Sequence, residues 1–166
     1  IRIVFLDEVD RFPTSAGTEG DPVSLAKKRT TTFWNRKIIM TSTPTVKGAS
    51  RIEQAFSESD QRKYYVPCLE CGEFQILYWA NIKWDQDEVG KHLPETARYV
   101  CEFCEHEIKE ADKSRLLLGG EWRATDESNG VAGFWINELY SPWVSWSDMV
   151  TTFIEAKKYP ETLKVF

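Results

Sequence analysis

The sequence predicts an α/β fold, in which a parallel sheet is followed by a cysteine-rich β segment and then by an α+β region. Two short apolar runs with a helical pattern between them open the chain, and this strand–helix–strand order is typical of a parallel sheet. After Ser59 the pattern changes to short strand-like runs around two Cys-x-x-Cys pairs. We therefore expect three parts, covering residues 1–60, 61–109 and 110–166.

The first part contains two predicted strands and two predicted helices. Residues 1–6 form a continuous run rich in β-branched and aromatic side chains, which predicts a fully buried strand. Asp21 and Pro22 supply the N-cap and the first-turn proline of a helix over residues 22–32. A second strand is expected at residues 37–41, and Ser50 with Glu53 forms a capping box for a helix through Phe56.

The other two parts contain shorter elements. Strands are expected at residues 64–66, 74–79, 98–100, 122–125 and 133–140, and an insertion at about residues 85–94 separates the cysteine pairs. Helices are expected at residues 110–118, before Gly119 and Gly120, and at residues 147–158, before Pro160.

The composition is that of a globular protein, with 42% hydrophobic and 28% charged residues. The absence of a long apolar run argues against a membrane span, and the lack of an initiator Met favours a piece of a longer chain. The net charge of −5 hides an asymmetry, because residues 1–63 hold 11 basic and 8 acidic residues. The basic clusters are either a local patch or solvated helix ends and loops: Lys27-Lys28-Arg29, Arg36-Lys37 and Arg62-Lys63.

An apolar strand that ends in Asp7 and Glu8 has the form of a Walker B motif. In an open α/β sheet, a buried parallel strand delivers its last residues to the crevice where nucleotides bind. Asp7 is then expected to hold Mg²⁺, usually through water, and Glu8 to orient and deprotonate the water that attacks the γ-phosphate. The alternative is an ordinary strand followed by a polar turn.

A Ser/Thr tract, Thr41-Ser42-Thr43-Pro44, follows the second predicted strand. Many ATP-driven nucleic-acid motors place such a tract on the strand beside Walker B, where its hydroxyls sense the γ-phosphate and relay hydrolysis to movement. The two motifs, in this order and linked by a helix, favour an ATPase in which Ser42 and Thr43 act with Asp7 and Glu8. An ordinary turn is again the alternative.

All four cysteines fall in two pairs, Cys68-x-x-Cys71 and Cys101-x-x-Cys104. Two such turns present four thiolates to one tetrahedral Zn²⁺, at Zn–S distances of about 2.3 Å. Four protein ligands leave no open position, so the zinc is expected to be structural and the segment to be zinc-ribbon-like. A redox dithiol would need a thioredoxin-like context, and disulfides would need a secreted protein; the sequence has no sign of either.

Two further features are less specific. His106 could replace a cysteine as a zinc ligand, although four cysteines suffice, and both His92 and His106 are otherwise expected to be surface histidines. The aromatic tract from Phe134 to Trp146 could stack bases, but such tracts more often belong to a core or to a domain-packing surface.

Taken together, these motifs resemble the large terminase subunit of tailed phages, of the lambda type. The resemblance covers nearly the whole chain. Beyond the cysteine pairs, it is carried by the phrases Leu6-Asp7-Glu8-Val9-Asp10-Arg11-Phe12-Pro13, Gly20-Asp21-Pro22-Val23-Ser24-Leu25-Ala26, Phe33-Trp34-Asn35-Arg36-Lys37, Ser42-Thr43-Pro44-Thr45-Val46-Lys47-Gly48, Ser50-Arg51-Ile52-Glu53, Ser59-Asp60-Gln61-Arg62 and Leu139-Tyr140-Ser141-Pro142-Trp143-Val144-Ser145-Trp146.

The resemblance implies a motor that hydrolyses Mg-ATP to move double-stranded viral DNA into a procapsid, with a separate nuclease domain that cuts concatemeric DNA. Residues 1–60 would be the C-terminal part of a P-loop (RecA-like) ATPase sheet, with Asp7 and Glu8 as the Walker B acids and Ser42, Thr43 and Pro44 as the coupling motif. The implied partners are the terminase small subunit, the portal or procapsid, and further copies in a ring, in the cytoplasm of the bacterial host.

Two parts of the family pattern are missing, since the Walker A loop would lie before Ile1 and the nuclease carboxylates beyond Phe166. We therefore expect the chain alone neither to hydrolyse ATP nor to cut DNA, and we expect exposed apolar sheet edges to make it poorly soluble. Two alternatives remain open: a helicase-like motor with the same two motifs, and a non-enzymatic, zinc-stabilised binding module or scaffold.

Overall fold

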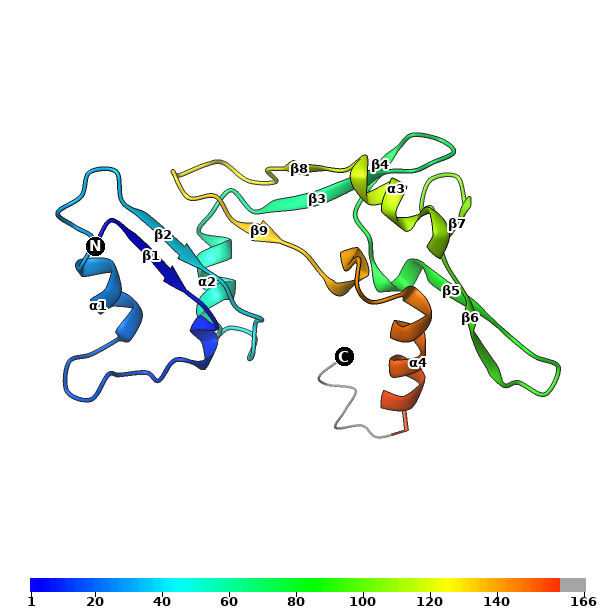
Figure 1. Ribbon diagram of the computed structural model, residues 1–166, viewed down its shortest axis with the longest axis horizontal. Coiled ribbons are helices and arrows are strands. Elements are labelled where there is room, and N and C mark those ends of the chain that lie inside the picture. Colours follow the sequence, from blue (N-terminus) through cyan, green and yellow to red (C-terminus); the bar gives the residue numbers. More distant parts are fainter. Residues whose placement is uncertain (159–166) are drawn as a thin grey trace. The chain divides into compact units, whose positions relative to one another are not determined.

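The computed structural model describes residues 1–158 and divides into two compact units (Figure 1). Unit 1 comprises Ile1–Gln61 and Asp126–Gly133, and unit 2 comprises Arg62–Thr125 together with the chain from Phe134 onward. Within residues 1–158, no helix is both long and apolar enough to cross a lipid bilayer.

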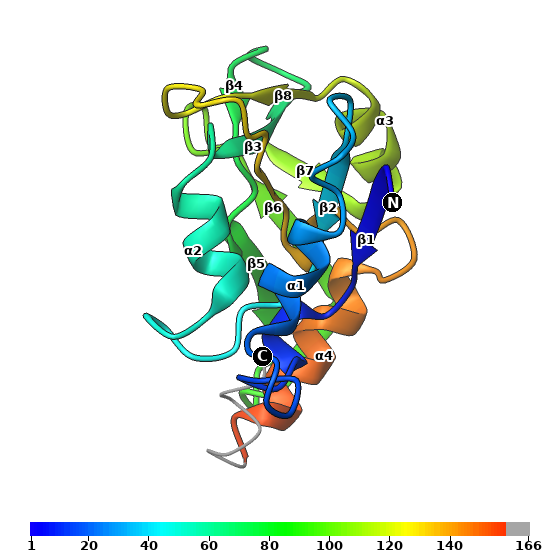
Figure 2. The ribbon, with the colours of Figure 1, turned by 90° about the vertical axis from the view of Figure 1, so that its left-hand side faces the viewer.

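Unit 1 is built on two parallel strands, β1 (Ile3–Leu6) and β2 (Lys37–Met40), so the expected parallel pairing is confirmed. The connection between them contains the 3₁₀ turn η1 (Val9–Arg11) and the helix α1 (Pro22–Lys28), which lies beside β1 (Figures 1 and 2). The helix α2 (Arg51–Ser57) follows β2. The buried core of this unit is small and consists of Leu6, Val9 and Val23.

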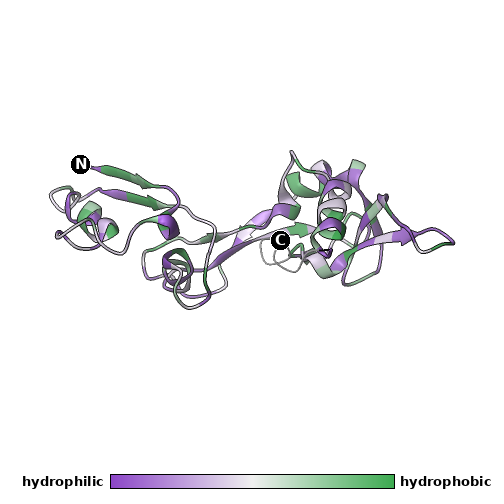
Figure 3. Cartoon of the chain, turned by 90° about the horizontal axis from the view of Figure 1, so that it is seen from below, coloured by the Kyte–Doolittle hydropathy of each residue, from purple (hydrophilic) through white to green (hydrophobic). Residues whose placement is uncertain are grey.

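The expectation of a fully buried first strand is wrong. β1 is hydrophobic along its length (Figure 3), but Ile3 is 49% and Phe5 is 61% exposed. The strand register places Ile39 beside Phe5, and Ile39 is 44% exposed. Only the opposite face, which carries Val4, Leu6, Ile38 and Met40, packs against the core. A parallel sheet is normally covered on both faces, and here a single face is covered.

Side-chain hydrogen bonds explain where the helices of unit 1 begin and end. α1 stops before the expected residue 32, because the hydroxyls of Thr30 and Thr31 donate to the carbonyls of Lys27 and Lys28 at 2.7 and 2.8 Å. Ser50 caps α2 as expected and accepts from the Glu53 amide at 3.0 Å. The return bond of the capping box differs, since the Glu53 carboxylate accepts from Gly48 instead of from Ser50.

Unit 2 contains two sheets. In the first, β3 (Arg62–Pro67) pairs antiparallel with β4 (Phe74–Gln75) and β8 (Glu121–Arg123) and parallel with β9 (Phe134–Trp135). The second is the antiparallel sheet of β5 (Ile82–Gln86), β6 (His92–Val100) and β7 (Glu107–Lys109). The insertion expected at residues 85–94 is the end of the β5–β6 hairpin.

The helices of unit 2 are close to those expected. Residues 110–118 form the 3₁₀ turn η3 (Glu110–Asp112) and the helix α3 (Lys113–Leu118), and the last described helix is α4 (Trp146–Ala156). Pro160, which was expected to end it, lies outside the described residues.

The expected strand at residues 133–140 is wrong beyond β9, because the chain turns into η4 (Glu138–Tyr140), which Asn137 caps. A further 3₁₀ turn, η2 (Trp79–Asn81), precedes β5.

Two buried tyrosines take the place of a strand partner after β4, which is why the expected strand at residues 74–79 stops early. The Tyr99 hydroxyl donates to the Ile76 carbonyl at 3.1 Å. The Tyr140 hydroxyl accepts from the Leu77 amide and donates to the Tyr64 carbonyl, both at 2.8 Å. Burial raises the pKa of both tyrosines, so both hydroxyls stay protonated and able to donate.

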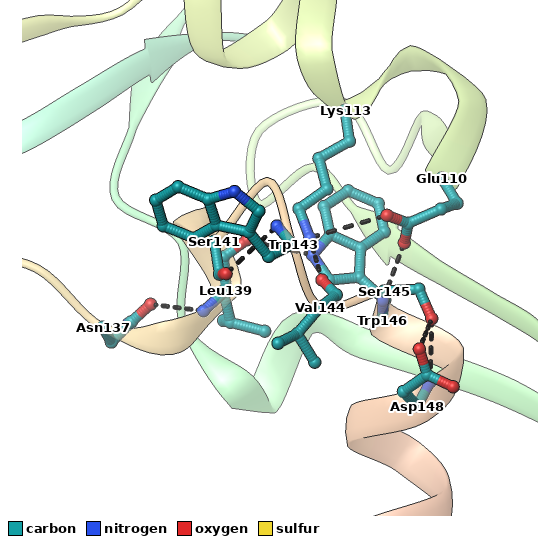
Figure 4. A network of polar contacts seen from close by, with 10 residues as sticks. All are labelled: Glu110, Lys113, Asn137, Leu139, Ser141, Trp143, Val144, Ser145, Trp146 and Asp148. Carbon is teal, nitrogen blue, oxygen red and sulfur yellow. Dashed lines mark hydrogen bonds and ion pairs between the residues drawn. The ribbon is translucent and has the colours of Figure 1, made fainter.

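A buried lysine fixes the loop that leads into α4 (Figure 4). Lys113 is only 4% exposed, and its ammonium donates to the Val144 carbonyl at 2.8 Å and lies 3.5 Å from the Glu110 carboxylate. The same carboxylate accepts from the Trp146 amide at 2.7 Å, and the ammonium lies over the Trp146 ring. Burial lowers the pKa of Lys113, and Glu110 opposes that shift. The loop is thereby held between η3, α3 and α4.

The aromatic tract at residues 134–146 is core in part only. Tyr140 and Trp146 are buried in the core of unit 2, whereas Trp143 is 89% exposed. The core interpretation is confirmed for the two buried rings.

Replacing Tyr140 with Phe is expected to lower the free energy of unfolding by about 1–3 kcal/mol, because the buried Leu77 amide loses its acceptor and the Tyr64 carbonyl loses its donor. The matched control is Tyr78→Phe, at a ring that is 41% exposed. Urea unfolding followed by tryptophan fluorescence measures both, and equal stability of the two variants would contradict the proposed role of the Tyr140 hydroxyl.

Replacing Lys113 with Met is expected to lower the free energy of unfolding by about 1–3 kcal/mol, since the Val144 carbonyl loses its donor and Glu110 loses its cation. Lys109→Met, at an exposed lysine of the same segment, should change stability by about 0.5 kcal/mol or less. Thermal melting in the same buffer compares the two, and a Lys113→Met protein as stable as the parent would show that the network contributes nothing.

Candidate functional site

The carboxyl ends of β1 and β2 form one edge of the sheet of unit 1. Asp7 follows β1 and Thr41 follows β2, and the Thr41 hydroxyl donates to an Asp7 carboxylate oxygen at 2.5 Å. The backbone continues the pairing, since the Thr41 amide donates to the Leu6 carbonyl and the Val9 amide donates to the Thr41 carbonyl. The strand that ends in acids and the strand that ends in hydroxyls are therefore joined directly.

Glu8 adopts a left-handed backbone conformation, with φ 55° and ψ 45°. A residue other than glycine in this region is strained, and such strain is found most often at functional sites. The Glu8 amide donates to the Asp7 carboxylate at 3.0 Å, and its carbonyl accepts from the Arg11 amide at 2.8 Å. Both carboxylates, of Asp7 and Glu8, are exposed.

Asp10, the third acid after β1, has both carboxylate oxygens occupied by hydrogen bonds from neighbouring groups. Its carboxylate accepts from the amides of Thr45 and Ile52, at 3.0 and 2.9 Å, and from the Thr45 hydroxyl at 3.2 Å. Burial alone would raise the pKa of Asp10, but hydrogen bonds from Ser50, Ile52 and Thr45 outweigh it and hold the pKa below its ordinary value. Asp10 therefore ties the turn after β1 to the loop after β2.

The Ser/Thr residues of the edge lie in different environments. The Ser42 hydroxyl accepts from the Asp10 amide and donates to the Thr43 carbonyl, both at 3.2 Å. The Thr43 side chain is exposed. The hydroxyl that contacts Asp7 is thus that of Thr41, the first residue of the tract, and not that of Ser42 or Thr43.

Arg51 braces the same turn from α2. Its guanidinium donates to the carbonyls of Val9, Phe12 and Pro13 at 3.0–3.2 Å and pairs with Asp21 at 3.0 Å. Sequence reasoning missed Asp10 and Arg51 as site-shaping residues. The signal available was their place in the phrases that carry the family resemblance, but nothing in their spacing predicted which backbone groups they would satisfy.

The four cysteines of unit 2 form one compact group, in which all four Sγ atoms lie within 4.8 Å of one another. Cys68 lies 3.7 Å from Cys104, and Cys71 lies 3.9 Å from Cys101, measured between sulfurs. Four thiolates around one zinc ion at about 2.3 Å lie about 3.8 Å apart, so this donor set fits tetrahedral Zn²⁺.

The two Cys-x-x-Cys turns have matching backbone geometry. The Gly72 amide donates to the Cys68 carbonyl and the Glu105 amide to the Cys101 carbonyl, both at 3.0 Å. Gly72 and Glu105 each follow the second cysteine of a pair and both have positive φ, 76° and 60°. In each turn, the amide two residues after the first cysteine points at its sulfur, from Glu70 at 3.5 Å and from Phe103 at 3.4 Å. These amides favour the thiolate at both first positions, but burial outweighs them at Cys68 and raises its pKa.

The thiol pKa values are spread apart. The amide of Glu73 favours the Cys71 thiolate, but burial and the neighbouring thiols together raise the pKa of Cys71 to about 12. Burial opposes ionisation of Cys101, but amide hydrogen bonds from Cys104 and Phe103 bring its pKa down to about 7. Four thiolates at this spacing need a cation to neutralise them, which a zinc ion would supply.

Neither histidine belongs to the cysteine group. His106 contributes only its backbone carbonyl, which accepts from the Cys101 amide at 3.0 Å. His92 accepts a hydrogen bond from the Trp84 indole at 2.9 Å on the β5–β6 hairpin. Both histidines are half-buried, where surface histidines were expected.

Comparison with known proteins gives two family matches. The family described as phage terminase large subunit gpA, ATPase domain, matches residues 1–122, and that described as terminase large subunit gpA, endonuclease domain, matches residues 131–166. The second match overlaps residues 110–166, which were expected to link to a nuclease domain. No solved structure matches the chain.

Two curated relatives are terminase large subunits of phages. That of Enterobacteria phage P21 is 31% identical over 196 residues, which cover 100% of this chain and 29% of the relative. That of Escherichia phage lambda is 29% identical over 175 residues, which cover 91% of this chain and 26% of the relative. The chain thus spans less than a third of the length of these relatives. From the ATPase match over residues 1–122 and the identity to the phage P21 protein, we conclude that the chain belongs to the gpA family of phage terminase large subunits.

Proposed function

We propose that the chain is part of an ATP-driven motor that packages viral double-stranded DNA into procapsids and, in the complete protein, cuts concatemeric DNA. The observation that carries this proposal is the contact between Asp7 and Thr41 at the shared carboxyl edge of two parallel strands. The family supplies the substrate, because DNA packaging is what a terminase large subunit does. Family membership also favours this motor over the helicase-like one.

The edge has the groups that ATP hydrolysis needs on one side of the nucleotide. Asp7 would hold the Mg²⁺ of Mg-ATP, and Glu8 would orient the attacking water and accept its proton. Thr41, Ser42 and Thr43 would couple the state of the nucleotide to the loop after β2, and Asp10 and Arg51 would hold the turn in place. The hydrogen bond from Thr41 to Asp7 supports this coupling, since a hydroxyl that contacts the Mg²⁺-side carboxylate responds to what that carboxylate binds.

The phosphate-binding loop is proposed to come from sequence that precedes this region in the complete protein, because no glycine-rich Lys-Ser/Thr loop occurs in residues 1–166. The chain alone should therefore hydrolyse no ATP. Nuclease activity is likewise proposed for the complete protein only, since the endonuclease family model matches no more than residues 131–166 of this chain.

Zinc is proposed as a structural ion held by Cys68, Cys71, Cys101 and Cys104. Four sulfur donors leave no position for a substrate or for water, so the ion would stabilise unit 2 without taking part in ATP hydrolysis or DNA cleavage. The alternative of a non-enzymatic, zinc-stabilised module can therefore hold for unit 2 while the complete protein is a motor.

The proposed partners are double-stranded viral DNA, the terminase small subunit, the portal or procapsid, and further copies of the large subunit in a ring. The proposed place of action is the cytoplasm of the bacterial host. Family membership supports each of these.

In the complete large subunit, Glu8→Gln is expected to lower the kcat of ATP hydrolysis at least about a hundredfold while ATP still binds, because the variant keeps the shape of the side chain but cannot accept a proton. Glu19→Gln, at an exposed loop position of unit 1, is the matched control. Phosphate release and nucleotide binding are measured on the same preparations. An unchanged kcat would contradict the assignment of Glu8, and Mg²⁺-dependent hydrolysis by residues 1–166 alone would contradict the assignment of the phosphate-binding loop.

Elemental analysis of the purified chain is expected to give one zinc per chain, and either Cys68→Ser or Cys101→Ser should abolish it together with the fold of unit 2. His106→Ala is the matched control and should keep the metal, because His106 contributes only a backbone carbonyl. Full zinc content in the Cys68→Ser protein, or zinc loss in His106→Ala, would overturn the four-cysteine assignment.

A further inference from the structure

The stretch between Asp21 and Glu53 contains seven basic residues and no acidic residue. Five of the seven gather with Arg2 at one end of unit 1. We name these six residues the basic end: Arg2, Lys27, Lys28, Arg29, Arg36 and Lys37. All six are exposed.

Backbone hydrogen bonds bring the basic end together. The Ile1 nitrogen donates to the Arg29 carbonyl at 3.0 Å, which joins the end of α1 to the start of β1 (Figure 1). The Lys37 amide donates to the Arg2 carbonyl at 2.9 Å, which joins the start of β1 to the start of β2. Because β1 and β2 are parallel, the basic end lies at the edge of the sheet opposite to Asp7 and Thr41.

The charges of the basic end are not neutralised within the part of the chain that the structure describes. Among residues 1–158, none of the six side chains has an ion pair. The C-terminus of α1 accounts for cations at Lys27 and Lys28, since lysine is favourable in a last helical turn. It does not account for Arg2, Arg36 or Lys37, which lie at the starts of β1 and β2. Six like charges gathered in this way repel one another until a polyanion binds.

A tryptophan lies in the middle of the basic end. Trp34 is 95% exposed and Phe33 is 40% exposed, in the turn between Arg29 and Arg36. The turn is ordered by hydrogen bonds from the Phe33 amide to the Thr30 carbonyl, at 3.1 Å, and from the Arg36 amide to the Phe33 carbonyl, at 3.3 Å. An exposed indole held in this way is available for contact with a ligand.

We propose that the basic end binds the phosphodiester backbone of duplex DNA. A duplex carries one negative charge per about 1.7 Å of its axis, and lysine and arginine that contact phosphates release the counterions held there. Proteins that bind single strands combine basic grooves with several stacking rings, whereas here the cations far outnumber the aromatic side chains. This inference rests on the proposed function, in which duplex DNA is the substrate, and deepens it by assigning the surface that binds the duplex. Because the surface is distinct from the edge with Asp7, its test does not depend on ATP hydrolysis.

The test is binding of a fluorescent, mixed-sequence duplex to the chain, followed by anisotropy between about 50 and 200 mM salt. The triple variant Lys27→Gln, Lys28→Gln, Arg36→Gln is expected to reduce the slope of log affinity against log salt by about 3, because each cation that neutralises a phosphate adds roughly one to that slope. Trp34→Ala is expected to weaken binding without changing the slope, because it removes no charge.

The matched control is Lys83→Gln, Lys91→Gln, Lys109→Gln, which makes the same change in charge at exposed lysines of unit 2 and should keep the slope of the parent. Circular dichroism confirms that each variant is folded, and the same variants in the complete large subunit should give the same order of affinity. The proposal is overturned if the chain binds no duplex or if both triple variants reduce the slope equally. Tighter binding to a single strand, or to anionic phosphatidylserine vesicles, would overturn it as well.

Discussion

Two β-hairpins from different sheets of unit 2 meet at four sulfur atoms. β3 leads into Cys68 and returns as β4, while β6 leads into Cys101 and continues into β7. The sulfurs of both turns belong to one group. The two turns are also joined by a hydrogen bond, in which the Glu102 amide of the second turn donates to the buried Gln75 side chain beside the first at 3.1 Å. Cys68 and Cys101 belong to the same buried core as Val66, Leu77 and Tyr99. A cation that holds the thiolates together would therefore also hold the two sheets together over their common core.

The three acids after β1 differ in role because they differ in what surrounds them. Asp10 has its oxygens occupied by backbone amides, and its lowered pKa is the result of those bonds. Asp7 receives one side-chain hydroxyl and one amide and stays exposed, which leaves lone pairs for a ligand. A saturated carboxylate fixes a loop, whereas an unsaturated one at a strand end can bind a cation. Asp10 therefore stabilises the loops around the edge, whereas Asp7 is exposed and can bind a cation there.

Sequence patterns predicted those features that depend on neighbouring residues. The parallel strands, the caps at Asp21 and Ser50, and the cysteine group follow from local spacing, and each is present. The features that were missed depend on distant partners. No local pattern shows that the hydroxyls of Tyr99 and Tyr140 satisfy the backbone after β4, which ends a predicted strand early. In the same way, no local pattern shows that the Thr41 hydroxyl contacts Asp7, because the two residues are 34 positions apart.

The sheet of β1 and β2 in unit 1 has one exposed apolar face, so unit 1 lacks burial that zinc binding in unit 2 cannot replace. Ile3, Phe5 and Ile39 remain largely exposed, although fully burying such a side chain contributes about 1.5–3 kcal/mol. The core of unit 1 has only three buried hydrophobic residues. The free energy that burial of the exposed side chains would contribute is therefore large relative to the net stability of a domain, about 5–15 kcal/mol. Zinc would act on unit 2 alone, since all four cysteines lie there. The expectation of poor solubility therefore concerns β1 and β2, and no supply of metal would relieve it.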